Sequence, residues 1–455
     1  MQAFAEKKSS ISKKISGFVK RSGISKSNLG LIVTDSQGHN LYTLNENSRL
    51  IPASITKIMT SLALLDYFDS DFQFQTQVFT SGELSGNKLN GNIYLKGGGD
   101  PGFVSEKMWV MVNEFIRTGI KKISGNIFVD ESFFDTERVD PGRDTENIDH
   151  AYDAPIGALS FNWNSANIFV RPGDSVGDKA RVWVDPENKY ATLKNSATTS
   201  KNTTDLDASR INDGDKDVLL VSGTISINSD EKIIYRNITN PNLFAGYAFR
   251  EFLRQRGVEV SGEVERGNVP ETANLVVDQF GDPIGKIIEG MNKFSNNYIA
   301  EMLTKGLGAD KTESVGHMKD GIEQIEEFIE DRLKIQKDSY ALVNVSGLTR
   351  KNYFTPKHFA LALNWARKQF KIFPEFLHSL PISGVDGTLH KRLMEDDVQG
   401  RIRAKTGSMT GIVSLAGYIG RPDKESLTFA FIYNGHGKEG KVRDLFDRIS
   451  ASLTK

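Results

Sequence analysis

The 455-residue sequence predicts an α/β (α+β) fold, in which an antiparallel sheet flanked by helices is interrupted by a large β-rich insert. Three observations predict it. Helices and apolar strands occur at both ends of the chain, short alternating strands dominate from about 70 to 270, and helices return after 280. We therefore expect a discontinuous domain of residues 1–68 and 275–455, with residues 69–274 inserted as two small subdomains.

The N-terminal elements follow from their apolar patterns. Residues 6–22 carry apolar side chains on one helical face, and residues 29–46 contain two short strand-like runs separated by a polar turn, which predicts a hairpin. After Pro52, a helix is predicted from about Ser54 to Tyr67. This helix is apolar on most of its circumference, so we expect it to be buried.

The remaining elements are predicted from the same periodicities. In the insert we expect strands at 74–79, 91–95, 123–129 and 218–227, helices at 105–118 and 242–256, and a polar surface excursion at 184–216. Beyond it we expect helices at 283–305, 319–333, 355–370 and 437–453, and strands at 412–419 and 427–433.

Composition excludes several functions. With 57 Lys+Arg against 58 Asp+Glu, the formal charge of −1 gives no reason to expect a nucleic-acid partner. Zero Cys excludes disulfides, thiolate catalysis and Cys-ligated metals. The seven His are scattered without an H-E-x-x-H pattern, so we expect no metal or other cofactor. No apolar stretch approaches the 18 residues that an integral membrane segment needs.

The start of the chain lacks the apolar region of a complete signal peptide. Ala3-Phe4-Ala5 has the A-x-A form of a cleavage site. Either an export leader has been trimmed from the sequence, or the match is a chance one.

Three short motifs carry the candidate chemistry, in the order S-x-x-K at Ser54–Lys57, S-x-N at Ser295–Asn297 and K-T-G at Lys405–Gly407. The first two patterns also occur elsewhere in the chain, so the signal lies in their context and order. At i and i+3 of a buried helix, Ser54 and Lys57 share one face. A lysine that burial keeps neutral is able to take the proton of a serine nucleophile. The alternative is an ordinary helix start whose lysine reaches solvent.

The other two motifs suit substrate binding. Lys405 and Thr406 suit a carboxylate, Gly407 permits close approach of a ligand, and the N–H groups of Ser408 and Ser54 suit an oxyanion hole. The alternative is a basic edge strand with a glycine kink. The S-x-N motif interrupts a helical pattern, so a local break there would aim its side chains into a cleft. A solvent-facing polar patch or a helix cap is the alternative.

These residues, in this order, resemble the penicillin-interacting serine enzymes. Longer matches narrow the resemblance to the D-alanyl-D-alanine carboxypeptidase/endopeptidases of the type-4 low-molecular-mass (class C) penicillin-binding protein family. The supporting segments are Leu95–Pro101, Ala154–Ser160, Ser346–Arg350 with Thr355-Pro356, and Gly384–Leu389. The similarity runs from about 28 to 435, and it implies a penicillin-binding/serine β-lactamase-like domain.

The resemblance also implies a role for each residue of the motifs. Ser54 would be the nucleophile, Lys57 the base for acylation, Ser295 a proton relay to the leaving amine, and Lys405 an electrostatic support. In the same way Asn297 would bind an amide of the substrate, and Thr406, Gly407 and Ser408 would line the strand on which the peptide lies. The sequence departs from the family at Asn344 and Asn296, where Asp is common, which affects local support and substrate detail.

A serine DD-peptidase that acts on peptidoglycan stem peptides, and that β-lactams acylate, is thus the expected function, with a periplasmic or cell-envelope location. Two alternatives remain open: a serine β-lactamase or esterase with the same acylation machinery, and a non-catalytic cell-wall-binding protein. The balance of carboxypeptidase and endopeptidase activity, the oligomeric state, membrane association and the role of the insert are not predicted.

Overall fold

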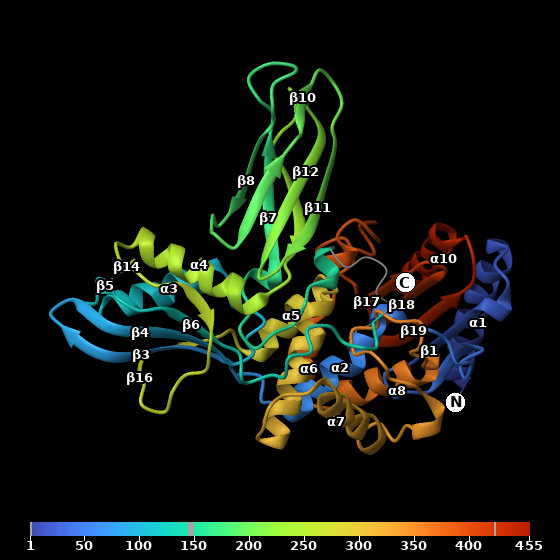
Figure 1. Ribbon diagram of the computed structural model, residues 1–455. Helices are drawn as coiled ribbons and strands as arrows, with labels where there is room; N and C mark the ends of the chain where they lie inside the picture. Colours follow the sequence, from blue (N-terminus) through green and yellow to red (C-terminus); the bar gives the residue numbers. More distant parts are fainter. Residues whose placement is uncertain (1, 144–149, 423–424) are drawn as a thin grey trace.

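A five-stranded antiparallel sheet joins the two ends of the chain in the computed structural model, which describes residues 2–143, 150–422 and 425–455. N-terminal and C-terminal strands lie side by side in it (Figure 1). In order across the sheet these are β17 (Ile402–Met409), β18 (Ile412–Gly420), β19 (Ser426–Asn434), β1 (Leu29–Thr34) and β2 (Asn40–Leu44). The predicted antiparallel sheet is therefore confirmed, and β17 forms one of its edges.

Helices cover both faces of this sheet, because successive residues of a strand point to opposite sides. In β19, Phe429 and Phe431 belong to the core beneath α1 (Gln2–Ser22) and α10 (Glu439–Ser452). Ala430 of the same strand belongs to the core on the other face. The helices of that core are α2 (Lys57–Tyr67), α5 (Ile284–Lys293), α6 (Asn297–Thr312), α7 (Met318–Asp331), α8 (Pro356–Arg367) and α9 (Phe373–Ser379).

The α2 helix is buried, as its apolar circumference predicts: every residue from Lys57 to Leu65 is buried. It begins at Lys57 rather than at Ser54, because residues Ala53–Thr56 form the 3-10 turn η2. The tighter turn still leads directly into the helix. Ser54, which lies in η2, is therefore supported by a buried helix of the core.

The middle of the chain builds a second sheet with the order β14-β5-β4-β3-β16, to which β6 and β15 are added. Helices α3 (Ser105–Ile116) and α4 (Pro241–Gln255) pack on it. Its strands are β3 (Gln75–Ser85), β4 (Lys88–Gly97), β5 (Lys122–Ile123), β6 (Ile127–Asp130), β14 (Glu259–Val260), β15 (Val264–Arg266) and β16 (Asn274–Phe280). Because β16 pairs with β3 along its length, this sheet ends at residue 280.

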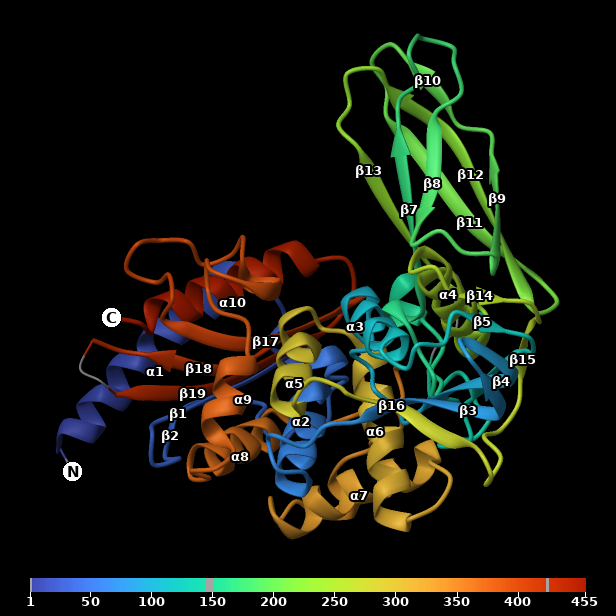
Figure 2. The same cartoon turned by 90° about the vertical axis from the view of Figure 1, so that its left-hand side faces the viewer.

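Two smaller sheets, ordered β13-β7-β8 and β10-β12-β11 with β9 on β12, project from the rest of the molecule (Figures 1 and 2). Their strands are β7 (Ser165–Arg171), β8 (Arg181–Asp185), β9 (Ala191–Asn195), β10 (Thr198–Ser200), β11 (Asp205–Asp213), β12 (Lys216–Ser226) and β13 (Lys232–Asn237). Residues 184–216, which we expected to be a polar surface excursion, are mostly exposed or half-buried, but they form strands of this projecting unit. A narrow two-layered unit needs few apolar side chains, and Tyr190, Ala197 and Ala208 supply them here.

Short 3-10 turns complete the fold: η1 (Lys26–Asn28), η3 (Ala151–Asp153), η4 (Asn162–Asn164), η5 (Lys337–Ser339) and η6 (Gly387–Leu389). The η3 turn reaches the helical core beside α6, which brings part of the middle of the chain to the motifs. Within the described residues, no helix is both long and apolar enough to cross a membrane.

Candidate active site

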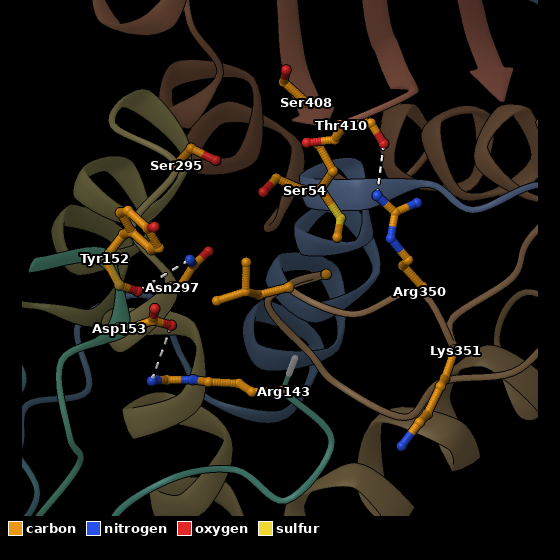
Figure 3. A pocket seen from close by; sticks show the side chains of 13 residues that line it. Ser54, Arg143, Tyr152, Asp153, Ser295, Asn297, Arg350, Lys351, Ser408 and Thr410 are labelled. Atoms are coloured by element: carbon orange, nitrogen blue, oxygen red, sulfur yellow. Dashed lines mark hydrogen bonds and ion pairs between the residues drawn. The ribbon is translucent and has the colours of Figure 1, made fainter. Parts of the chain in front are cut away.

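Ser54 lies in a cavity of about 1080 Å³ that is also lined by Ser295 and Asn297 of the second motif and by Ser408, which directly follows the third (Figure 3). The turn that carries it starts at Ala53, whose φ of +50° is unusual for a residue with a side chain. Two glycines allow neighbouring segments to pack against this turn. A Cβ on Gly407 would lie 2.1 Å from Ser414 Oγ and 3.1 Å from the Ser54 backbone nitrogen, and one on Gly347 would lie 2.1 Å from the Ala53 carbonyl oxygen.

The Lys57 amine is buried directly behind Ser54. Its Nζ lies 3.4 Å from Ser54 Oγ, and it donates to Asn297 Oδ1 at 2.7 Å and to the Ser346 carbonyl oxygen at 2.5 Å. A neutral amine has two N–H groups and one lone pair. With both N–H groups accepted by Asn297 and Ser346, the lone pair is left for the serine hydroxyl.

Electrostatics favour that neutral amine. Burial lowers the pKa of Lys57 well below its ordinary value, and the positive charges of Lys405 and Arg143 lower it further. The carboxylate of Glu301, one helical turn beyond Asn297, acts in the opposite direction. The net shift makes Lys57 able to accept a proton at a pH far below that of a solvent-exposed lysine.

Ser295 lies in the break between α5 and α6, and the predicted interruption of the helix is confirmed. Its φ of +57° turns the chain, and the Asn296 side chain then caps α6 by accepting from the Ile299 N–H at 3.1 Å. Lys405, on the edge strand β17, donates to Ser295 Oγ at 2.8 Å. Burial lowers the pKa of Lys405 to about 7.

Asn297 is engaged on both sides of its amide. Its Oδ1 accepts from Lys57, and its Nδ2 donates to the Tyr152 carbonyl oxygen at 3.3 Å (Figure 3). Tyr152 belongs to η3, so the middle segment of the chain forms one wall of the cavity. Asn297 thus links Lys57 to that wall, and its bond to a substrate amide stays a prediction.

The edge strand β17 carries the third motif, and the last two residues of this strand, Ser408 and Met409, line the cavity. Thr406 Oγ1 lies 2.8 Å from Thr388 Oγ1, and exposed Ser408 accepts from Arg443 Nη2 at 2.9 Å through its hydroxyl. Gly407 was predicted to permit the close approach of a ligand. Its missing side chain also lets β17 pack against η2, the turn that carries Ser54. Ser54, Ser295, Asn297 and Ser408 therefore line one cavity. The buried Lys57 and Lys405 are bonded to residues of its wall, and Thr406 and Gly407 precede Ser408 on β17. The individual roles of these eight residues stay predictions.

Several cavity residues were not predicted as site residues. Arg143 lies in a polar loop with no recognisable pattern, and Tyr152 is a single aromatic residue in η3. Arg350, which donates to the Thr410 carbonyl oxygen at 2.7 Å, ends the Ser346–Arg350 segment, to which the sequence assigns no role in the site. The cavity is completed by Asp153, Gly347, Leu348, Lys351, Met409 and Thr410. The charge of Arg350 at the end of this segment is the sequence feature from which its place in the site could have been predicted.

This arrangement suits acyl transfer. A serine hydroxyl faces an amine held neutral, and a second hydroxyl is bonded to a second lysine across the same cavity. Among the described residues, no group of three or more His, Cys, Asp or Glu is placed to hold a metal ion.

Comparisons with known proteins agree with this chemistry. Residues 11–453 match the model of the D-Ala-D-Ala carboxypeptidase 3 (S13) family. The D-alanyl-D-alanine carboxypeptidase of Actinomadura sp. (strain R39) is 30% identical over 432 residues, which cover 90% of this chain and 78% of that protein. In structure, the chain is similar to penicillin binding protein 4 from Haemophilus influenzae, with a TM-score of 0.81 and 21% identity over 97% of this chain and 99% of that one. A structure of the same Haemophilus protein in complex with a novel β-lactam superposes with a TM-score of 0.77, over the same shares of the two chains and at 21% identity.

Proposed function

The chain belongs to the D-Ala-D-Ala carboxypeptidase 3 (S13) family, and from this membership we propose how its own residues carry out the reaction. It is a serine hydrolase of the penicillin-binding type that acts on peptidoglycan. The proposal concerns the role of each side chain, the substrates and the location.

Acylation begins at Ser54. Its Oγ attacks the carbonyl carbon of a D-alanyl peptide bond while Lys57 takes the hydroxyl proton. The observation that carries this assignment is the buried Lys57 amine, 3.4 Å from Ser54 Oγ, whose two N–H groups have other acceptors. The Ser54 backbone N–H and the adjacent N–H of Ser408 receive the developing oxyanion.

The leaving amine needs a proton when the C–N bond breaks. Ser295 supplies it as a relay, since its hydroxyl is bonded to Lys405, whose pKa is lowered to about 7. Water then attacks the acyl carbon, and one of its protons passes through Ser295 to Lys405. The ester bond to Ser54 Oγ breaks as Lys57 returns the proton to Ser54, which restores the hydroxyl and releases the peptide carboxyl group. Thr406 and Ser408, on the exposed edge of β17, bind the terminal carboxylate of the substrate, with Gly407 between them.

The proposed substrates are peptidoglycan stem peptides, either trimmed of terminal D-alanine or cut at a cross-link, and the proposed location is the cell envelope. β-Lactams, which resemble the scissile peptide, would acylate Ser54. The family membership and the β-lactam complex of the Haemophilus relative support this. We further propose that residues 69–274 are an insert into a discontinuous catalytic domain; the strands of this segment pair with one another and with β16, which favours placing its end near residue 280.

Labelling by a fluorescent penicillin tests the assignment. We expect wild type to be labelled and Ser54→Ala to lose labelling completely, because the variant has no Oγ with which to form the ester. Labelling that persists in Ser54→Ala would reject Ser54 as the nucleophile. Product analysis on defined monomeric and cross-linked muropeptides then separates trimming from cross-link cleavage, and uncut substrates would favour a non-catalytic wall-binding protein. A short acyl-enzyme lifetime would favour a β-lactamase.

A further inference from the structure

A cluster of buried charged groups lies behind Lys57, and the reaction steps above do not use it. We call it the acid cluster: Asp140, Glu301 and the Arg143 guanidinium, with the side chain of Asn344 between the two acids. All four residues are buried. Arg143 Nε donates to both carboxylate oxygens of Glu301 at 3.0 Å, and Arg143 Nη2 donates to Glu301 Oε2 at 2.5 Å.

Asn344 supplies the donor that two carboxylates share. Its Nδ2 donates to Asp140 Oδ2 at 2.8 Å and to Glu301 Oε1 at 3.1 Å. A carboxylate at position 344 would have no hydrogen to donate and would place a third negative charge among buried groups. The amide therefore matches this position in both hydrogen bonding and charge.

The carbonyl oxygen of the Asn344 side chain binds the loop of residues 346–348, which contacts Lys57. Asn344 Oδ1 accepts from the Ser346 hydroxyl at 2.6 Å and from the N–H groups of Ser346 and Leu348 at 3.1 and 3.0 Å. The carbonyl oxygen of Ser346 in turn accepts from Lys57 Nζ at 2.5 Å. One side chain thus connects the acid cluster to the carbonyl that orients the base.

Charged groups of both signs act on the pKa of Lys57. Glu301, from α6, raises the pKa of Lys57, whereas Lys405 from β17 and Arg143 from the loop before η3 lower it. Asp140 interacts with Glu301 and Arg143; burial and the Glu301 charge raise its pKa to about 6. Asp153, whose pKa is also raised by burial, lies 3.8 Å from Arg143. One more negative charge in the acid cluster would favour the protonated, inactive form of Lys57.

We propose that Asn344 is a positioning residue for the base: its amide fixes the Ser346 carbonyl and limits the negative charge behind Lys57, so that Lys57 stays able to take the Ser54 proton. This inference rests on the proposed role of Lys57 in acylation. It assigns to Asn344 an electrostatic function that a merely structural residue in the same loop would not have.

The test is the pH profile of the acylation rate with a fluorescent penicillin. Asn344→Asp should move the rising limb of the profile upward by about one pH unit, so that acylation below the midpoint is about tenfold slower. The double variant Asn344→Asp with Asp140→Asn exchanges the two side chains, so that the amide now at position 140 is able to donate to the carboxylate now at position 344. We expect the double variant to return the midpoint towards that of wild type.

Asn352 offers a matched control. Its amide holds the same loop: it donates to the Asn344 carbonyl oxygen at 2.6 Å and accepts from the N–H groups of Val343 and Asn344 at 2.7 and 3.0 Å. It also donates to Thr56 Oγ1 at 3.5 Å, so none of its partners is charged. Asn352→Ala should slow acylation without moving the midpoint. An unchanged midpoint in Asn344→Asp, or an equal shift in Asn352→Ala, would overturn the proposal.

A further variant covers the case in which Asn344→Asp does not fold. Glu301→Gln removes a negative charge from the same cluster and should lower the midpoint, and an unchanged or higher midpoint would overturn the proposal. Failure of wild type to be labelled at all would instead reject the proposed function, so the two failures are distinguishable.

Discussion

Gly407→Ala should slow acylation at Ser54, because the added methyl group would push the edge strand β17 away from the turn that carries Ser54. A Cβ at this position would lie 2.1 Å from Ser414 Oγ, 2.9 Å from the Pro52 carbonyl oxygen and 3.1 Å from the Ser54 nitrogen. Ser414 Oγ donates to that same Pro52 oxygen at 2.6 Å. Rotating the Ser414 side chain away from the new Cβ would therefore break a buried hydrogen bond. Normal van der Waals contact would need a separation of about 3.4 Å or more, so β17 and the turn must shift by roughly 1 Å.

The expected magnitude follows from that shift. A misplacement of about 1 Å costs catalysis roughly 100-fold, and overpacking of a buried contact costs about 1–3 kcal/mol of unfolding free energy. We therefore expect acylation by a fluorescent penicillin to fall about 100-fold in Gly407→Ala, with a moderate loss of stability in a denaturant titration.

Two further variants control this experiment. Gly440→Ala introduces the same methyl group in α10, where the added Cβ meets no neighbouring atom within 4 Å, so rate and stability should stay at or above the wild-type values. Adding Ser414→Ala to Gly407→Ala removes the closest clashing atom and should recover part of the rate. If Gly407→Ala were acylated at the wild-type rate, the packing of β17 against the nucleophile turn would not matter, and the reasoning would be refuted.

Three more expectations concern stability, all measured by denaturant unfolding. Leu62→Ala, in the fully buried part of α2, should cost about 2–5 kcal/mol, whereas a loss below about 1 kcal/mol would contradict the close packing of that helix. Asn296→Ala removes the cap of α6 and should cost about 1 kcal/mol, while Asn296→Asp keeps an acceptor at the helix start and should cost less. The pKa of Asp140 is raised from 3.8 to about 6 in the folded protein, so its protonation stabilises the fold below about pH 4, and that stabilisation is lost as pH rises through about 6. Stability should therefore increase between about pH 7 and 4 by up to about 3 kcal/mol from this group, and Asp140→Asn should lack this contribution; an identical pH dependence in the two proteins would contradict it.

Much of the scaffold around the site was predictable because its signals are local. The apolar circumference of residues 57–65 predicts a buried helix, and short apolar runs predict strands that pair in the terminal sheet. The interruption at Ser295–Asn297 is likewise a local effect of side chains that compete with the helix for backbone groups. The strands within 184–216 were not predicted, since a polar stretch in a thin two-layered unit lacks the apolar pattern on which such predictions depend.

The sequence by itself determined which chemical groups this protein carries and in what order: a serine followed at i+3 by a lysine, a polar break in a helix, and a basic strand with a glycine. Only the tertiary structure decided that the Lys57 amine donates hydrogen bonds to Asn297 and Ser346, which lie 240 and 289 residues away along the chain. It also decided that Arg143 and Glu301, 158 residues apart, pair behind the base. Periodicity is set by neighbours along the chain, but the desolvation and charge that make a lysine a base come from groups that meet only when the chain is folded.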